Sequence, residues 1–150
     1  MSQTAKVAYF SMEIALDPSI HTYSGGLGML AGDTLRSVAD LGVPMVAVTL
    51  AHRKGYFQQR LDAMGNQTEA EDPWRPEDSL TPEKAIAAVV IEGRTVRVRG
   101  WRFTIQGISG HAVPVFLLDT DLSENSPWDR RLTDYLYEVT NTTEFVRKRS

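Results

Sequence analysis

The sequence predicts an α/β protein whose core is a parallel β-sheet, and three apolar runs indicate this class. "KVAYFSME" at 6–13 is followed by a segment of helical periodicity and then by the continuous apolar run "VPMVAVTLA" at 43–51. A strand, a helix and a strand in this order form a βαβ unit. A third continuous run at 112–119 is typical of a buried strand, so we expect all three strands in one parallel sheet.

The helix between the first two strands is predicted from about Leu27 to Leu41. Its apolar residues recur at the spacing of one helix face, with polar residues on the opposite side. The apolar set comprises Leu27, Leu30, Ala31, Leu35, Val38 and Ala39. Gly42 and Pro44 then follow in the order that usually ends a helix.

An antiparallel hairpin is predicted in the second half of the chain. Its arms are 86–91 and 95–105, joined at Glu92-Gly93-Arg94. The apolar alternation of the second arm shifts phase, and a β-bulge at Gly100 would account for the shift. Trp101 and Phe103 are expected in the core.

Two further stretches are less regular. Residues 62–84 are polar and rich in Pro, Glu and Asp, which predicts a surface excursion anchored by Trp74. From Pro127 to about Tyr137 we expect a helix. Residues 1–137 therefore form one predicted domain, and 138–150 a divergent tail.

Composition excludes several classes of function. The chain has 150 residues, no cysteine and a net charge of −3, which argues against disulfides, thiol catalysis and a nucleic-acid footprint. No apolar run approaches the ~20 residues that span a bilayer, and the N-terminus lacks the pattern of a signal peptide. The expected location is cytoplasmic, with no membrane and no nucleic acid as partner.

Three glycines stand directly in front of the predicted helix, in "YSGGLGML". A helix N-terminus offers free N–H groups and a partial positive charge. Glycines at that position let an anion approach the backbone. Gly25, Gly26 and Gly28 therefore favour an anion site over a tight loop without a ligand.

The same residues fit the G-x-G-x-x-A form of a dinucleotide-binding fingerprint, but two features disfavour that interpretation. About ten residues separate Glu13 from Gly25, whereas the fingerprint follows its strand at once. The next strand ends in Ala51-His52-Arg53 rather than in an acidic residue. Because His52 and Arg53 could suit a 2′-phosphate, a nicotinamide enzyme is disfavoured rather than excluded.

Other polar residues carry weaker signals. The three histidines, His21, His52 and His111, lack metal-ligand spacing, so no metal site is predicted. Asp119 and Asp121 end a strand, where acids often act, but they are expected to cap the next turn. The remaining candidates are expected to be solvated or structural: Ser24, Arg94, Arg97, Arg99 and Arg102.

Four segments, in order and spacing, resemble the N-terminal domain of the α-glucan phosphorylases. They are "AYFSMEIAL", "YSGGLGMLAGDTLRSVADLGVP", "RKGYFQQRLD" and "LLDTDLSENSPWDRRLTDYLY". The resemblance covers 7–137. It implies phosphorolysis of α-1,4-glucan to glucose 1-phosphate, in a two-domain glycosyltransferase fold whose N-terminal domain is Rossmann-like.

By the same resemblance, Gly25, Gly26, Leu27 and Gly28 form a glycine loop whose backbone faces phosphate and sugar, and Glu13 makes a polar contact in the cleft. No catalytic residue is assigned. The family's pyridoxal phosphate is held by a lysine of the C-terminal domain, so none is expected on this chain alone. The implied partners are α-1,4-glucan and inorganic phosphate, and a homo-oligomer is an open possibility.

The chain departs from the family after Tyr137, where "EVTNTTEFVRKRS" does not align. We therefore expect a truncated phosphorylase that is inactive alone. Two alternatives stay open at this point. One is a fragment of a glucosyltransferase of the glycogen-synthase type, although Ser24 stands where that class usually has a basic residue. The other is a non-catalytic module that binds an anion or a partner.

Overall fold

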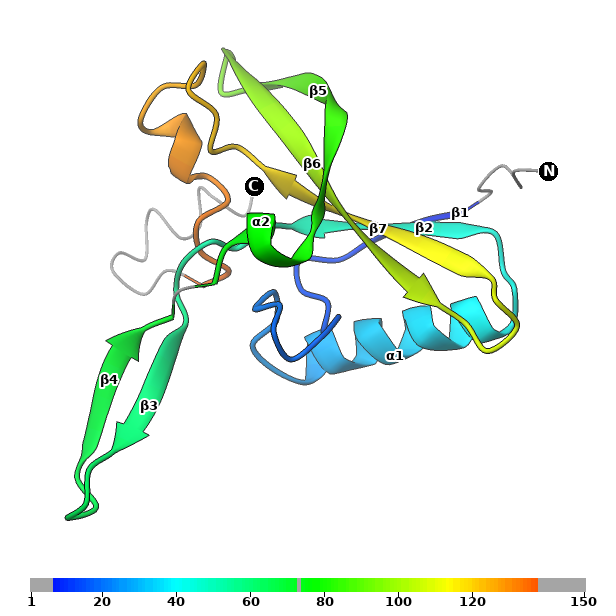
Figure 1. The fold of residues 1–150 in the computed structure, drawn as a ribbon. Helices are drawn as coiled ribbons and strands as arrows, with labels where there is room; N and C mark the ends of the chain where they lie inside the picture. Colours follow the sequence, from blue (N-terminus) through cyan, green and yellow to red (C-terminus); the bar gives the residue numbers. More distant parts are fainter. Residues whose placement is uncertain (1–6, 73, 138–150) are drawn as a thin grey trace.

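The computed structural model describes residues 7–72 and 74–137 (Figure 1). Its main sheet has five strands in the order β1-β2-β7-β6-β5. The strands are β1 (Val7–Phe10), β2 (Met45–Leu50), β5 (Thr81–Ile91), β6 (Arg94–Gln106) and β7 (Ala112–Asp119). β1, β2 and β7 are parallel, as the three apolar runs predict, and β6 is antiparallel to both its neighbours. The chain is thus α/β with a mixed sheet.

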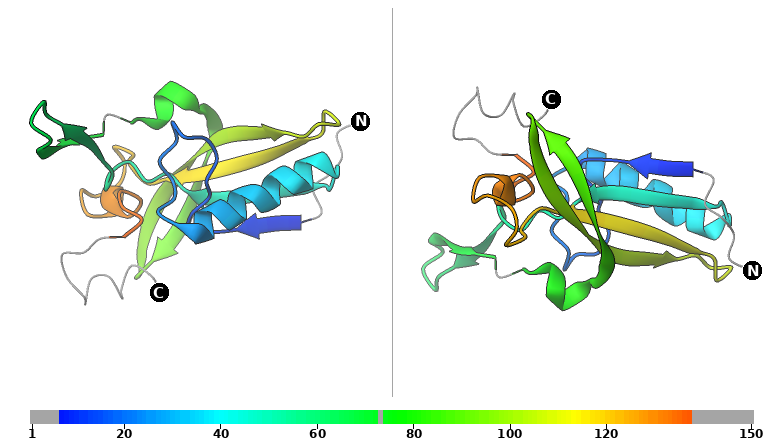
Figure 2. Two further views of the ribbon diagram at one scale, coloured as in Figure 1. Left: turned by 90° about the horizontal axis from the view of Figure 1, so that it is seen from below. Right: turned by 90° about the horizontal axis from the view of Figure 1, so that it is seen from above.

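The predicted helix is confirmed as α1 (Gly26–Asp40), which covers one face of the sheet (Figure 2). Its buried face is made of small residues and one leucine: Gly28, Ala31, Gly32, Leu35 and Ala39. A Cβ at position 32 would lie 2.2 Å from the carbonyl oxygen of Ala15, so this close approach requires glycine. Leu27 and Leu30, expected on the apolar face, are instead 55% and 65% exposed.

The first strand is shorter than the predicted 6–13, because the chain leaves the sheet at Ser11. The last bond on this side runs from the N–H of Ser11 to the carbonyl of Val48. Ile14 and Leu16 are buried in the core without pairing in the sheet. These residues are apolar because they pack in the core near α1. Hydrophobic periodicity alone cannot distinguish such packing from burial in a strand.

The antiparallel hairpin is confirmed as β5 and β6, and the predicted core residue Trp101 is 3% exposed. The bulge is in the partner strand rather than at Gly100. Pairing shifts between Pro82 and Ile86 of β5, whereas β6 pairs with β7 without a break from Arg99 to Gln106. β6 is held on both sides, so the irregularity falls on the edge strand.

The segment predicted as a surface excursion, 62–84, contains regular structure that the sequence did not indicate. β3 (Phe57–Leu61) and β4 (Gln67–Glu71) form a separate two-stranded sheet, called the arm here, that projects from the body (Figure 1). α2 (Pro76–Ser79) follows, and Trp74 packs against the core as expected. The Asp62 carboxylate accepts the N–H groups of Met64 and Asn66, so turn chemistry holds the hairpin where no apolar alternation announces it.

The helix expected over 127–137 is also wrong. The segment holds only the 3₁₀ turn η1 (Asp129–Arg131). Successive turn bonds join its backbone, such as that from the N–H of Asp134 to the carbonyl of Arg131. Side chains tie it and the preceding turn to the sheet: Thr133 Oγ1 accepts the N–H of Thr120 at 3.1 Å, and the Asn125 side chain bonds to Arg97 of β6. The predicted tail at 138–150 lies outside the described residues.

Candidate functional site

The glycine loop and its neighbours gather at the carboxyl ends of the parallel strands. In open α/β sheets ligands bind at this edge. α1 begins at Gly26, so Gly26, Leu27 and Gly28 of the glycine loop form its first turn, and the N-cap residue Gly25 makes no side-chain capping bond. The N–H of Met29 donates to the carbonyl of Gly25 at 3.2 Å, the first turn bond of the helix. The N–H groups of Gly26, Leu27 and Gly28 therefore have no acceptor within the helix.

The predicted site residue Glu13 lies beneath this loop and is 2% exposed. One carboxylate oxygen accepts the N–H groups of Ser24, at 2.8 Å, and Gly25, at 3.3 Å. The other oxygen accepts the hydroxyl of Tyr137 at 2.8 Å. A buried carboxylate with three donors fixes backbone geometry, so Glu13 holds the loop in place.

The loop glycines differ in what requires them. A Cβ at Gly28 would lie 2.3 Å from the Cβ of Tyr23 and 3.1 Å from the Glu13 carboxylate, so packing alone demands glycine there. At Gly25 and Gly26 an added Cβ would meet nothing within 4 Å, and neither residue has a positive φ. No packing contact of the described residues requires glycine at these two positions, and the space where their side chains would lie is open.

A cavity of about 230 Å³ adjoins the loop. Its lining comes from three segments: Ser24, Lys54, Gly55, Tyr56, Phe57, Leu136 and Tyr137. The Tyr56 hydroxyl donates to the carbonyl of Tyr23 at 2.5 Å. Burial, and then the nearby Glu13 charge, raise the pKa of Tyr56 to about 12, so this ring stays neutral. Aromatic faces beside hydroxyl and ammonium groups suit a polar ligand with an apolar side.

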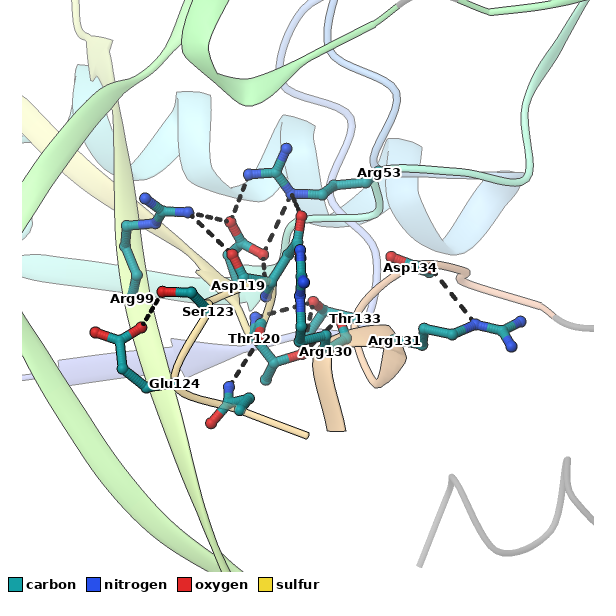
Figure 3. Close-up of polar contacts among 12 residues, drawn as sticks. Arg53, Arg99, Asp119, Thr120, Ser123, Glu124, Arg130, Arg131, Thr133 and Asp134 are labelled. Carbon is teal, nitrogen blue, oxygen red and sulfur yellow. Dashed lines mark hydrogen bonds and ion pairs between the residues drawn. The ribbon is translucent and has the colours of Figure 1, made fainter. Parts of the chain in front are cut away.

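A second polar cluster surrounds Asp119, at the end of β7 (Figure 3). This carboxylate is fully buried and accepts Arg53 Nη2 at 2.7 Å and the indole N–H of Trp101 at 2.8 Å. Arg99 approaches it at 3.4 Å and stacks over Trp101. Burial opposes ionisation of Asp119, but the hydrogen bonds from Arg53 and Trp101 outweigh it and hold its pKa below the ordinary value.

Most polar groups of the cluster are satisfied by the chain itself, and the Nε atom of Arg99 is the buried group there that has no hydrogen-bond partner among the described residues. The N–H of Asp121 donates to Asp119 Oδ1 at 2.9 Å, so the predicted turn cap is confirmed for Asp119. Arg53 also pairs with Glu77 at 3.1 Å, and Arg130 pairs with Asp121 at 2.6 Å. Because its charges are paired at short range, the Asp119 cluster has a structural role: it links β7 to the neighbouring segments.

The structure thus brings the predicted residues Glu13, Gly25, Gly26, Leu27 and Gly28 together at one end of α1. Sequence reasoning missed Tyr56 and Tyr137, the two aromatic residues that reach the loop. A signal was available for Tyr56, because it follows β2 at the same sheet edge as the loop. Tyr137 lies in an irregular segment, and no sequence pattern predicts where the residues of such a segment lie in the fold.

The lysines in the described ranges do not fit a Schiff-base site for pyridoxal phosphate. Lys54 is paired with Asp134 at 3.1 Å with its side chain 57% exposed, and Lys84 is exposed on β5. Over 7–72 and 74–137 there is also no cluster of three metal-ligating side chains, and no helix there is long and apolar enough to cross a bilayer.

Comparison with known proteins places the chain among phosphorylases, although no family model matches it. It is 41% identical over 140 residues to a maltodextrin phosphorylase of Thermococcus litoralis, which covers 89% of this chain and 16% of that protein. Glycogen phosphorylases of Mycobacterium tuberculosis and Aquifex aeolicus are 38% and 32% identical, each over 87% of this chain. The chain spans 16 to 19% of the length of these curated relatives. It therefore belongs to the family of the maltodextrin and glycogen phosphorylases and corresponds to one part of them.

Proposed function

We propose that this chain forms the glycine-loop side of an α-glucan phosphorylase site. The observation that carries the proposal is the pair of glycines, Gly25 and Gly26, that no packing contact requires, placed before three N–H groups without an intrahelical acceptor. Its relatives are named maltodextrin and glycogen phosphorylases, and such enzymes use phosphate. An oriented set of N–H groups at a helix N-terminus stabilises a phosphate without reorganising.

Each site residue then has a distinct role. The N–H groups of Gly26, Leu27 and Gly28 contact the phosphate, with the dipole of α1 behind them. Glu13 holds the loop from below and supplies polar contact rather than acid catalysis. The adjoining cavity receives the sugar against Tyr56 and Tyr137. Ser24, which directly precedes the glycine loop, lines the cavity, so phosphate and sugar would be adjacent.

The wider architecture is part of the proposal. Residues 1–137 would be the Rossmann-like N-terminal domain of a two-domain glycosyltransferase, and 138–150 a divergent tail. Pyridoxal phosphate would be held by residues of a partner domain, in line with the poor fit of Lys54 and Lys84. We place the protein in the cytoplasm. The similarity to phosphorylases does not favour a glucosyltransferase of the glycogen-synthase type.

Self-association also belongs to the proposal. Leu27, Met29 and Leu30 expose 45 to 65% of their surface beside the loop, and Phe10 exposes 73% on the edge strand. Apolar surface gathered in this way favours association. Light scattering should show a mass above that of one chain as concentration rises, and a monomer at every concentration would contradict this.

Glucose 1-phosphate tests the function because it carries both sugar and phosphate. In an NMR titration of the 150-residue chain we expect amide shifts at Gly26, Gly28 and Tyr56, absent in Gly26→Val. A Ser123→Ala variant, which removes a hydroxyl that contacts the Glu124 side chain at 3.0 Å, serves as the control and should behave as the unmodified chain. Shifts confined to the loop would favour the anion-binding module, and no shift at either place would overturn the proposal.

Catalysis needs a second measurement. Positioning from both sides of a phosphate carries most of phosphorolysis, and this chain supplies one side. We therefore expect no glucose 1-phosphate from maltodextrin and phosphate, with or without added pyridoxal phosphate. A phosphorylase preparation run in parallel shows that the assay works. Robust turnover by these 150 residues alone would contradict the one-sided site.

A further inference from the structure

The segment that leads into the glycine loop is held by both ends of the arm. Tyr56 immediately precedes β3, and its hydroxyl donates to the carbonyl of Tyr23 at 2.5 Å. Asp72 immediately follows β4, and its carboxylate accepts the Nδ1–H of His21. The His21 and Tyr56 rings also contact each other, with centroids 5.3 Å apart. The start and the end of the arm therefore meet on residues 21–23.

The residues between these contacts are tied to the body of the protein. Thr22 is fully buried, and its hydroxyl donates to the carbonyl of Ile14 at 2.8 Å. The N–H of Ile14 in turn donates to the carbonyl of Thr22. The His21 ring and the Tyr23 carbonyl thus contact the arm, while the Thr22 side chain turns to the core. Ser24 and Gly25 then bond to Glu13.

Burial makes the His21–Asp72 contact consequential. The Asp72 side chain is only 8% exposed, and that of His21 is 32% exposed. A carboxylate shielded from water in this way needs a donor to replace the water that it has lost. The arm depends on such anchoring, because a two-stranded sheet is marginal on its own and β3 is exposed along its whole length.

We propose that His21 and Asp72 are a positioning pair that fixes the arm and the glycine loop to each other. Neither residue touches phosphate in this account. The pair sets where residues 22–25 lie, and with them the first N–H groups of α1. Its effect on phosphate rests on the proposed function, whereas its effect on loop motion does not.

Amide hydrogen exchange of the full chain tests the pair directly. His21→Ala and Asp72→Ala should each raise exchange about tenfold at residues 22–25 and in the arm, the size expected for a charge-assisted hydrogen bond. Exchange in β7 should not change. His21→Asn should largely restore protection, because its side-chain amide can donate from near the Nδ1 position. The double variant should add little to either single change.

Asp33→Ala is the matched control, since Asp33 pairs with Arg36 at 3.4 Å on the exposed side of α1. It should leave both segments unchanged. Exchange that rises in the arm alone, or failure of His21→Asn to restore protection, would overturn the pair.

Inorganic phosphate separates this inference from the proposed function. If the unmodified chain shows no phosphate shift at Gly26 and Gly28, the proposed function fails while the exchange result still decides the pair. If it does bind, His21→Ala should weaken phosphate severalfold. Unchanged affinity despite faster exchange would overturn the positioning role.

Discussion

The glycine loop and the Asp119 cluster lie at the same edge of the sheet, but they differ in how far their polar groups are hydrogen-bonded within the chain. At Asp119, two arginines, an indole N–H and a backbone N–H surround one buried carboxylate. At the loop, Glu13 satisfies Ser24 and Gly25, while the next three N–H groups have no acceptor in their helix.

This difference distinguishes a structural cluster, at Asp119, from a candidate binding site, at the glycine loop. The residues around Asp119 carry several charges, yet most of those charges are paired within the cluster. The open groups belong to glycines without any side chain. Polar groups that the fold leaves without a partner, beside empty space, point to a ligand more directly than charge does.

The largest expected effect is on the closed cluster. Asp119→Ala would leave Arg53 and Arg99, 14% and 27% exposed in their side chains, without their shared partner. Removing one member of a buried ion network costs about 3 kcal/mol or more in the free energy of unfolding. Urea unfolding measures the loss. Asp33→Ala, which removes an exposed pair, should change stability by less than about 0.5 kcal/mol.

The glycines of the loop should divide by position. Gly28→Ala would force a Cβ to within 2.3 Å of Tyr23, and we expect a loss of about 1–3 kcal/mol in stability, typical of overpacking. Gly26→Ala meets open space and should be neutral or gain up to ~1 kcal/mol. Thermal unfolding of the two variants side by side checks the contrast. Equal losses would mean that Gly26, too, is required by packing.

Acid should affect the two regions in different pH ranges. His52 lies behind the loop, and burial lowers its pKa. The unfolded chain therefore takes up a proton below pH ~6.5 that the native chain resists, so stability falls as the pH drops from that value. The lowered pKa of Asp119 gives a second fall below pH ~4, because the unfolded chain then takes up a proton on this carboxylate that the native chain resists.

His52→Gln isolates the first of these two falls. The His52 Nε2 atom lies 3.0 Å from the carbonyl of Met12, and the Gln amide can keep that bond while removing the titration. Urea midpoints between pH 7.5 and 5 should decline for the unmodified chain and stay nearly level for the variant. A parallel decline in both would show that another group titrates there.

Much of the fold and part of the candidate site could be predicted from the sequence. The remaining features depend on contacts that no sequence pattern indicates. Continuous apolar runs predicted β2 and β7, and helical spacing predicted α1. The arm was not predicted, because β3 has no apolar alternation and its hairpin is held by the Asp62 turn. The packing requirement for glycine at position 28 could not be predicted, because its contact with Tyr23 forms only in the folded chain. The partners of Asp119 come from distant segments, so only the turn cap could be foreseen.

One measurement tests the central claim that the loop is open and the Asp119 cluster is closed. Inorganic phosphate is titrated into the chain while the amide signals of both regions are followed by NMR. We expect saturable shifts at Gly26, Leu27 and Gly28, weakened as salt rises and lost in Gly26→Val, with no shift at Asp119 or Asp121. Shifts centred on Arg53, Asp119 and Asp121, with the loop unmoved, would contradict it.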